Sequence, residues 1–289
     1  QHGIAFATET GVSTGRILFG NDGGVAYTDD GGTNTVHINT NYNVTQFYKA
    51  GIAQTTGSDL MIAGAQDNGV QFIDDATGTP DTAVRIAGGD GCWVFIDQDS
   101  QYMIGSYVYN SYSYHLMDGT NIGDLPTTGL NPNAGDFVNQ CGLDSAANIL
   151  YTNGTDAGNY QIYRYTIDPS GPSITTAILD NGLIDNTPSF FVASPYNTNR
   201  ILVGTAIGTL IQMDNANATP TWTEIGSPSF SGSISDIRYG ATDQDIMVTF
   251  HNYGVTSIWA TTDGGSTWAS KEGNLPDLPV KAILQNPLN

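Results

Sequence analysis

The chain has 289 residues and a formal net charge of −20, from 8 Lys and Arg against 28 Asp and Glu. This balance argues against a nucleic-acid partner and an anionic membrane surface, because both need clustered Lys and Arg. No apolar stretch approaches the about 20 residues of a membrane helix, so we expect no direct membrane insertion. The acidic excess fits a soluble extracellular protein, a salty medium, or divalent cations as counter-ions.

Short β-type runs separated by Gly, Asn and Asp follow one another along the chain, and no segment has helical periodicity with good caps. We name the four predicted strands of each unit A, B, C and D in chain order. The A runs begin near Ile4, Gln46, Trp93, Phe137, Ser189 and Ser235. The B runs lie at 16–20, 60–64, 102–105, 148–151, 200–204 and 246–248. They are strongly hydrophobic, which is typical of buried strands between stacked sheets.

An aspartate recurs about every 46 residues, each time near the end of a C run. The positions are Asp30, Asp75, Asp118, Asp168, Asp214 and Asp263. Four short strands in a unit of this length predict an all-β fold, a β-propeller of four-stranded blades. A two-sheet sandwich array is the rival, but its units would be nearer to about 100 residues. The predicted blades of this single domain, 1–289, are about 1–43, 44–90, 91–134, 135–184, 185–231 and 232–276.

One further A-type run begins at Val280, which gives six full repeats plus one extra strand at 280–289. The propeller is then six-bladed or seven-bladed. The extra strand could displace the N-terminal strand and close the ring, since open sheet edges invite unwanted pairing. The chain could also be cut from a larger ring. It begins at Gln1 without a signal peptide, so we expect a processed or excised start and flanking domains in a longer polypeptide.

Two of the aspartate turns share a motif. Thr261, Asp263, Gly265 and Trp268 fit the pattern Ser/Thr-x-Asp-x-Gly-x-x-Trp at every defined position. Thr28, Asp30 and Gly32 fit it without the final aromatic residue. The carboxylate can accept N–H bonds within its own hairpin, and the glycines permit positive φ. We therefore interpret these residues as structural rather than catalytic.

On these motifs the chain resembles the Asp-box (BNR, sialidase-like and sortilin-like) β-propellers. It is most similar to propeller modules of large secreted bacterial cell-surface proteins, which carry segments like 20–27, 66–69, 88–91 and 273–276. The resemblance covers essentially the whole chain. It implies an extracellular, secreted or cell-surface location, and it says little about activity, because function depends on the site and not the fold.

The B–C turns and D–A loops of a propeller usually form the ligand face. Asp22, Asp67 and Asp90 lie in such loops of the first three units. Three carboxylates near backbone oxygens would suit Ca²⁺, which takes six to eight oxygen ligands. The alternative is that each aspartate only stabilises its own tight turn. No other cofactor is expected.

Aromatic residues gather in the third unit, where Tyr107 and Tyr109 precede further tyrosines. Exposed tyrosines form good platforms for carbohydrate or protein, although they could instead fill the wedge between blades. His251 is a further candidate on the ligand face. Cys92 and Cys141, on the first strands of neighbouring units, could form a disulfide in an oxidising compartment or remain buried thiols.

A sialidase activity is disfavoured, because that family needs three arginines around the substrate carboxylate and a Tyr–Glu pair. No glutamate lies on an A run of this chain. The leading hypothesis is a non-catalytic extracellular interaction module that binds glycan or protein at the cell surface through the B–C/D–A face. The alternatives are a polysaccharide-active glycoside hydrolase (or half of one), with Asp22, Asp67 or Asp90 as acid or base, and a structural spacer in an adhesin or filament.

Overall fold

The computed structural model of the protein describes residues 3–6, 16–21, 24–38, 45–76, 82–171 and 173–284. These residues form six antiparallel sheets of four strands, and in each sheet the strands pair in chain order. No helix occurs within the described ranges, and thus none that could cross a membrane. The prediction of an all-β fold with six four-stranded units is confirmed.

The first three sheets contain β1 to β12. The first comprises β1 (Gly3–Phe6), β2 (Ile17–Asn21), β3 (Gly24–Thr28) and β4 (Val36–His37). The second comprises β5 (Phe47–Ile52), β6 (Met61–Ala65), β7 (Gly69–Ile73) and β8 (Val84–Ala87). The third comprises β9 (Val94–Ile96), β10 (Met103–Ser106), β11 (Tyr112–His115) and β12 (Asn121–Asp124).

The last three sheets contain β13 to β24. The fourth comprises β13 (Cys141–Asp144), β14 (Ile149–Asn153), β15 (Ile162–Asp168) and β16 (Ser173–Leu179). The fifth comprises β17 (Pro188–Ala193), β18 (Ile201–Thr205), β19 (Leu210–Asp214) and β20 (Thr221–Glu224). The sixth comprises β21 (Ile234–Tyr239), β22 (Ile246–Phe250), β23 (Ile258–Thr261) and β24 (Ala269–Ser270).

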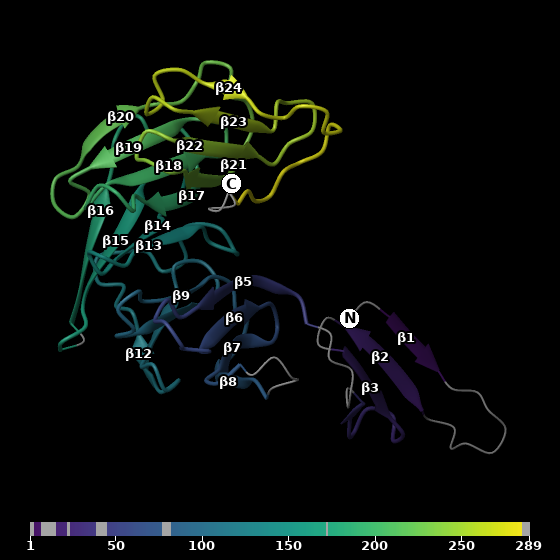
Figure 1. Cartoon of the computed structure of the whole chain (residues 1–289). Coiled ribbons are helices and arrows are strands. Elements are labelled where there is room, and N and C mark those ends of the chain that lie inside the picture. Colours follow the sequence, from purple (N-terminus) through teal and green to yellow (C-terminus); the bar gives the residue numbers. More distant parts are fainter. Residues whose placement is uncertain are drawn as a thin grey trace.

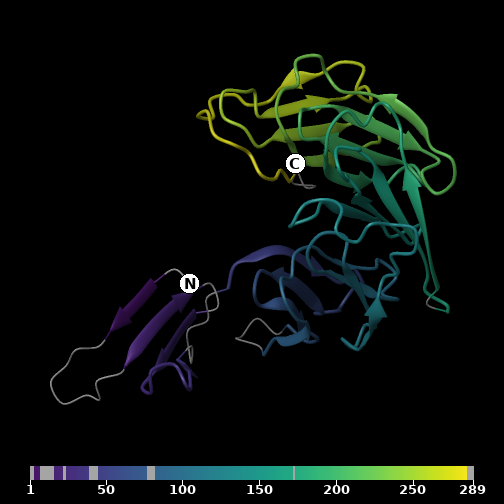
Figure 2. The same ribbon diagram turned by 180° about the vertical axis from the view of Figure 1, so that it is seen from behind.

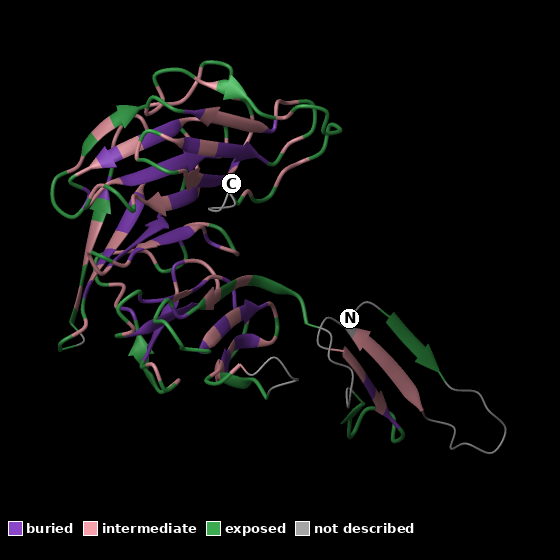
Figure 3. Cartoon of the chain, viewed as in Figure 1, coloured by how far each residue is buried: buried purple, intermediate pink, exposed green. Residues whose placement is uncertain are grey.

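The sheets from the second to the sixth follow one another around an arc, whereas the first sheet stands apart from them in both views (Figures 1 and 2). Each pair of neighbouring sheets in the arc encloses its own hydrophobic cluster. The second strands β14 and β18 are buried along their whole length, because they are covered on both faces (Figure 3). The fourth strands lie outermost and are largely exposed.

The tyrosines of the third sheet divide into two groups. Tyr102, Tyr112 and Tyr114 are buried, and the rings of Tyr102 and Tyr114 stack with centroids 5.2 Å apart. They fill the wedge between the third and fourth sheets. Tyr107 stays 45% exposed and Tyr109 is partly exposed, so the B–C hairpin keeps the tyrosines that a ligand can reach.

The two cysteines are free and buried, so no disulfide joins Cys92 to Cys141 in the structure. Cys141 packs in the cluster between the third and fourth sheets. Burial disfavours the charged thiolate and raises the pKa of Cys92 to about 11. Both side chains therefore pack as small apolar groups.

Two strand predictions need correction. The fourth sheet begins at Cys141, whereas Phe137 lies in the loop before it, which the side chain of Asn139 anchors to the Asn153 carbonyl at 2.9 Å. Residues 280–284 form no strand, and residues 285–289 lie outside the described ranges. This segment is held by three separate bonds. Ser235 Oγ of β21 donates to the Val280 carbonyl, the Ile283 N–H donates to Asp236, and the Val280 N–H donates to the Phe250 carbonyl at the end of β22.

The two predicted aspartate turns have the same hydrogen bonds. In the C–D hairpin of the sixth sheet, Thr261 Oγ1 donates to Asp263 at 2.7 Å and accepts the Gly265 N–H at 3.1 Å. Thr28 makes the matching bonds to Asp30 and Gly32 in the first sheet, at 2.8 and 3.0 Å. All four side chains therefore stabilise their own hairpins.

The aromatic residue of the complete motif reaches a neighbouring sheet. Trp268 donates its indole N–H to the Ile225 carbonyl at 2.8 Å and packs edge-on against Phe230, with ring centroids 4.9 Å apart. Gly265 has a φ of 95°, which a side chain rarely adopts. The motif thus joins the fifth and sixth sheets.

Candidate functional site between the second and third sheets

Two of the three predicted aspartates come together. Asp67, in the B–C turn between β6 and β7, donates its backbone N–H to Asp90 Oδ1 at 3.0 Å. Asp67 has a φ of 62°, and its turn is held further by the Gly91 N–H, which donates to the Ala65 carbonyl at 2.9 Å. Asp90 therefore joins the loop before the third sheet to the hairpin of the second.

These carboxylates do not form a calcium site by themselves. Oδ1 of Asp90 is used by the Asp67 N–H, and within the described ranges no three His, Cys, Asp or Glu side chains gather as metal ligands. Asp22 lies outside the described residues. Ca²⁺ binding at this face stays a prediction.

Tyr107 forms a wall at the same loops. Its backbone N–H donates to the Ser111 carbonyl at 2.8 Å, which closes the B–C hairpin of the third sheet. The ring packs against Gly89, which has a φ of 77° and leaves no room for a Cβ at that point. The glycine thus brings the loop before the third sheet directly under the tyrosine.

The remaining predicted residues lie farther along the loops. Tyr109 has a φ of 56°, and its ring meets Phe137 edge-on with centroids 6.1 Å apart. Phe137 is 43% exposed and extends the aromatic surface beyond the residues that the sequence predicted. His251 lies just after β22, in the sixth sheet, where burial and the charge of Lys281 lower its pKa.

A polar pocket of about 220 Å³ opens between the second and third sheets. We call it the inter-blade pocket. It is lined by Ala87, Gly88, Ser106, Tyr107, Ser111, Tyr112, Ser113, Asn121 and Asp124. Hydroxyl, amide and carboxylate groups thus face the same space beside one aromatic ring. The sequence predicted Tyr107 as a candidate ligand residue and placed Tyr112 in the same group of tyrosines. It gave no indication that Ser113, Asn121 and Asp124 would line the same pocket.

The serine in this pocket is held by a buried histidine. Ser113 Oγ lies 2.8 Å from His115 Nε2 and 3.2 Å from the Gly105 carbonyl. Burial lowers the pKa of His115, so the ring is neutral near pH 7. The Gly105 carbonyl can only accept, so the Ser113 hydroxyl donates to it, whereas the direction of the bond between Ser113 Oγ and His115 Nε2 depends on the imidazole tautomer. The two contacts hold the Ser113 hydroxyl in one orientation in the pocket.

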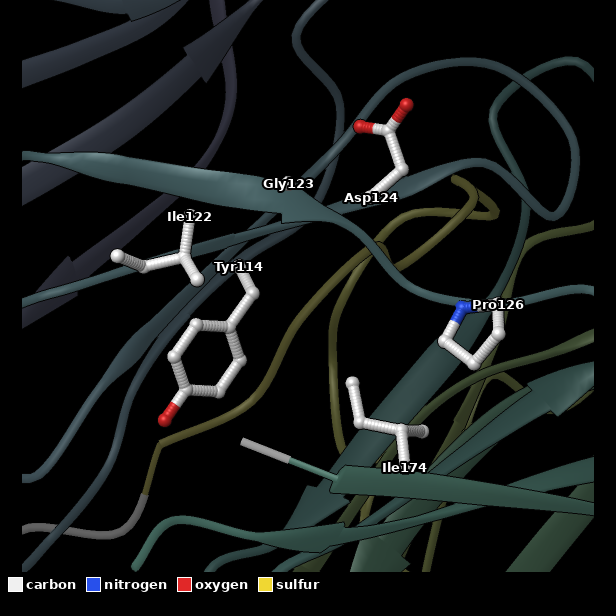
Figure 4. Close-up of a pocket in the computed structure, with 6 residues that line it drawn as sticks. All are labelled: Tyr114, Ile122, Gly123, Asp124, Pro126 and Ile174. Atoms are coloured by element: carbon white, nitrogen blue, oxygen red, sulfur yellow. The ribbon is translucent and has the colours of Figure 1, made fainter. Parts of the chain in front are cut away.

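The opposite face of the third sheet is apolar. Figure 4 shows a smaller cavity, of about 150 Å³, where Tyr114 and Ile122 of the third sheet face Ile174 of β16. The carboxylate of Asp124 points away from these side chains. Polar groups of β11 and β12 are therefore concentrated on the side that faces the second sheet.

Comparisons with known proteins identify the fold. No protein-family model matches the chain, and no curated protein matches it. YCF48 from Cyanidioschyzon merolae is similar with a TM-score of 0.58 and 16% identity, covering 93% of this chain and 84% of that one. The Cps50 (Swd1) β-propeller domain of Myceliophteria thermophila is similar with a TM-score of 0.51 and 14% identity, covering 79% and 66% respectively.

A chain in a crystal structure of the mitotic checkpoint complex is also similar, with a TM-score of 0.53 and 10% identity, covering 82% of this chain and 71% of that one. At such identities the similarity shows a shared fold only and carries no information about activity. Together with the six four-stranded sheets, these likenesses confirm the β-propeller fold.

Proposed function

We propose that the protein is a non-catalytic interaction module that binds a glycan in the inter-blade pocket. The observation that carries the proposal is the combination of Tyr107, half-exposed beside the pocket, with the polar side chains of Asn121, Asp124 and the serines. A sugar ring presents hydroxyl groups at its rim and an apolar face of C–H groups. An aromatic wall with nearby donors and acceptors matches both.

The polar side chains of the pocket differ in how firmly they are held. Asp124 and Asn121 are exposed at the outer strand β12, whereas Ser113 is held in place at the floor. Oriented polar groups lose little conformational entropy on binding, which favours a ligand rich in hydroxyl groups. The acidic composition supports an extracellular or cell-surface setting, and this location is part of the proposal.

A hydrolase receives less support from the geometry. Asp90 is engaged by the Asp67 backbone, and the hydroxyl of Ser113 is directed to a carbonyl. Neither arrangement poises a carboxylic acid and a base on two sides of a scissile bond, which glycoside hydrolysis requires. Binding without turnover is therefore the function that these groups favour.

The test is a panel of soluble and insoluble polysaccharides, with retention and released reducing ends scored together, in Ca²⁺ and in EGTA. The proposal expects retention on at least one glycan without release. Loss of retention in EGTA would add Ca²⁺ to the binding face. Release of reducing ends that disappears in Asp67→Asn or Asp90→Asn would replace the proposal with a hydrolase, and the absence of retention on all glycans would reject glycan binding in favour of a protein partner or a spacer.

A further inference from the structure

A second cavity lies on the inner side of the arc and is separate from the inter-blade pocket. It has a volume of about 510 Å³ and is lined by the first strands of five sheets, β5, β9, β13, β17 and β21. No residue lines both cavities. We call it the axial cavity. Its volume lies within the about 300–1,000 Å³ typical of small-molecule sites.

The walls of the axial cavity combine aromatic side chains with two cations. Trp93 and Phe95 of the third sheet and Phe191 of the fifth supply apolar surface. Lys49 of β5 and Arg238 of β21 supply the charge. The whole chain contains only 8 Lys and Arg against 28 Asp and Glu, and among the described residues no carboxylate lines this cavity. The sign of the charge is therefore reversed relative to the rest of the protein.

The two cations differ in their partners. Arg238 Nε lies 3.0 Å from Asp236 Oδ1, and this buried carboxylate also accepts the Ile283 N–H. For Lys49 the described residues offer no carboxylate within ion-pair distance. Among the described residues, these two cations thus have one neighbouring carboxylate between them, which leaves one positive charge without a counter-charge there.

Lys49 is held in a partly dehydrated position. Its ammonium lies 4.8 Å from the centroid of the Trp93 ring, where the cation is attracted to the π face. Burial lowers the pKa of Lys49, and the charge of Arg238 acts in the same direction, while Asp236 opposes it. An anion in the cavity would compensate this desolvated charge, because an opposite charge nearby favours the ionised form.

We propose that the axial cavity binds a small organic anion, a carboxylate with an aromatic or apolar body. The carboxylate lies between Lys49 and Arg238, and the body packs against Trp93 and Phe191. The charge provides selectivity for the acid over its neutral analogue, and the aromatic wall favours an anion with an apolar body over a simple inorganic anion. The site is independent of glycan binding at the inter-blade pocket.

The probe is 2-naphthoate, and its neutral amide 2-naphthamide is the matched control, with inorganic phosphate as a test of charge alone. Calorimetry and quenching of tryptophan fluorescence follow binding to the full chain. We expect one naphthoate to bind per chain, at least about tenfold more tightly than the amide, which corresponds to about 1.4 kcal/mol. Phosphate should bind more weakly than naphthoate.

The diagnostic variant is Lys49→Met, because Lys49 makes no ion pair with any residue that the structure describes, so its loss should leave the fold intact. It should weaken naphthoate binding at least about tenfold and leave the amide unchanged. Lys271→Met, at an exposed residue outside the cavity, should bind as the unaltered protein does, and thermal unfolding of each variant reports its fold. Equal binding of acid and amide, no binding of naphthoate up to about 5 mM, or full binding by a folded Lys49→Met protein would each overturn the proposal.

Discussion

Thr261 organises the complete aspartate turn through a hydroxyl that both donates and accepts. It is 4% exposed, donates to Asp263 and accepts the backbone N–H groups of Asp263 and Gly265. Thr261→Val keeps the shape and removes these bonds, so we expect a loss of about 1–3 kcal/mol in the free energy of unfolding. Urea denaturation measures it. Thr262→Val, at the exposed neighbour, is the matched control, and an equal loss in both variants would refute a special role for the Thr261 hydroxyl.

The carboxylate of the same turn makes stability depend on pH. Bonds from Thr267 and Thr261 lower the pKa of Asp263 to about 2, below the about 3.9 of an unfolded chain. The charged form is therefore favoured by folding, so its contribution is complete above about pH 4 and is lost as the pH falls through about 2. The stability gap between the unaltered protein and Asp263→Asn should narrow over that range. A gap that stays constant from pH 7 to about 2.5 would contradict this assignment.

The hairpin of the second sheet and the loop before the third sheet pack so closely that no space is left for an added side-chain atom at Gly91. A Cβ on Gly91 would overlap the Gly69 carbonyl oxygen and crowd the Ala65 nitrogen, both of them backbone atoms. Gly91→Ala should therefore lower the free energy of unfolding by about 1–3 kcal/mol. Gly88→Ala is the comparison, since a Cβ there meets nothing within 4 Å. Thermal or urea unfolding of the two variants measures this difference. Equal stability of Gly91→Ala and Gly88→Ala would show that the backbone around Gly91 can move to accept a Cβ at little cost.

The strands that the sequence predicted best are those with a continuous apolar run, because such a run is stable only when both faces of the strand are buried. The predicted run at 200–204 has a hydrophobic centre, and residues 201–205 form β18, which is buried on both faces. Sequence failed where tertiary contacts compete with local pattern. A strand was predicted to begin near Phe137, because a β-type run starts there. In the structure Phe137 lies in a loop, which the Asn139 side chain holds by donating to the Asn153 carbonyl. The run at Val280 makes two bonds to side chains of β21 and one to the Phe250 carbonyl, and these do not add up to a strand ladder.

The binding sites depend on how separate sheets meet, and this explains why sequence revealed so little of them. Loop position placed Asp67 and Asp90 on the same face of the propeller, but only the structure shows that the Asp67 N–H donates to the Asp90 carboxylate. Residues that are far apart in the sequence line the same cavity: Gly88 and Asp124 both line the inter-blade pocket, and Lys49 and Arg238 both line the axial cavity. A repeat pattern gives the order of the sheets, but it does not give the side chains that face one another across them.

The most direct test of the account is the dissociation constant of Tyr107→Ala for whichever glycan the protein retains, compared with that of Tyr253→Ala. Tyr253 is 69% exposed on the hairpin of the sixth sheet and lies outside the inter-blade pocket, so its removal controls for a generic loss of surface aromatics. We predict that Tyr107→Ala weakens binding at least about fivefold, or about 1 kcal/mol, while Tyr253→Ala binds normally. Unchanged affinity in a folded Tyr107→Ala protein, or an equal loss in both variants, would contradict a glycan site between the second and third sheets.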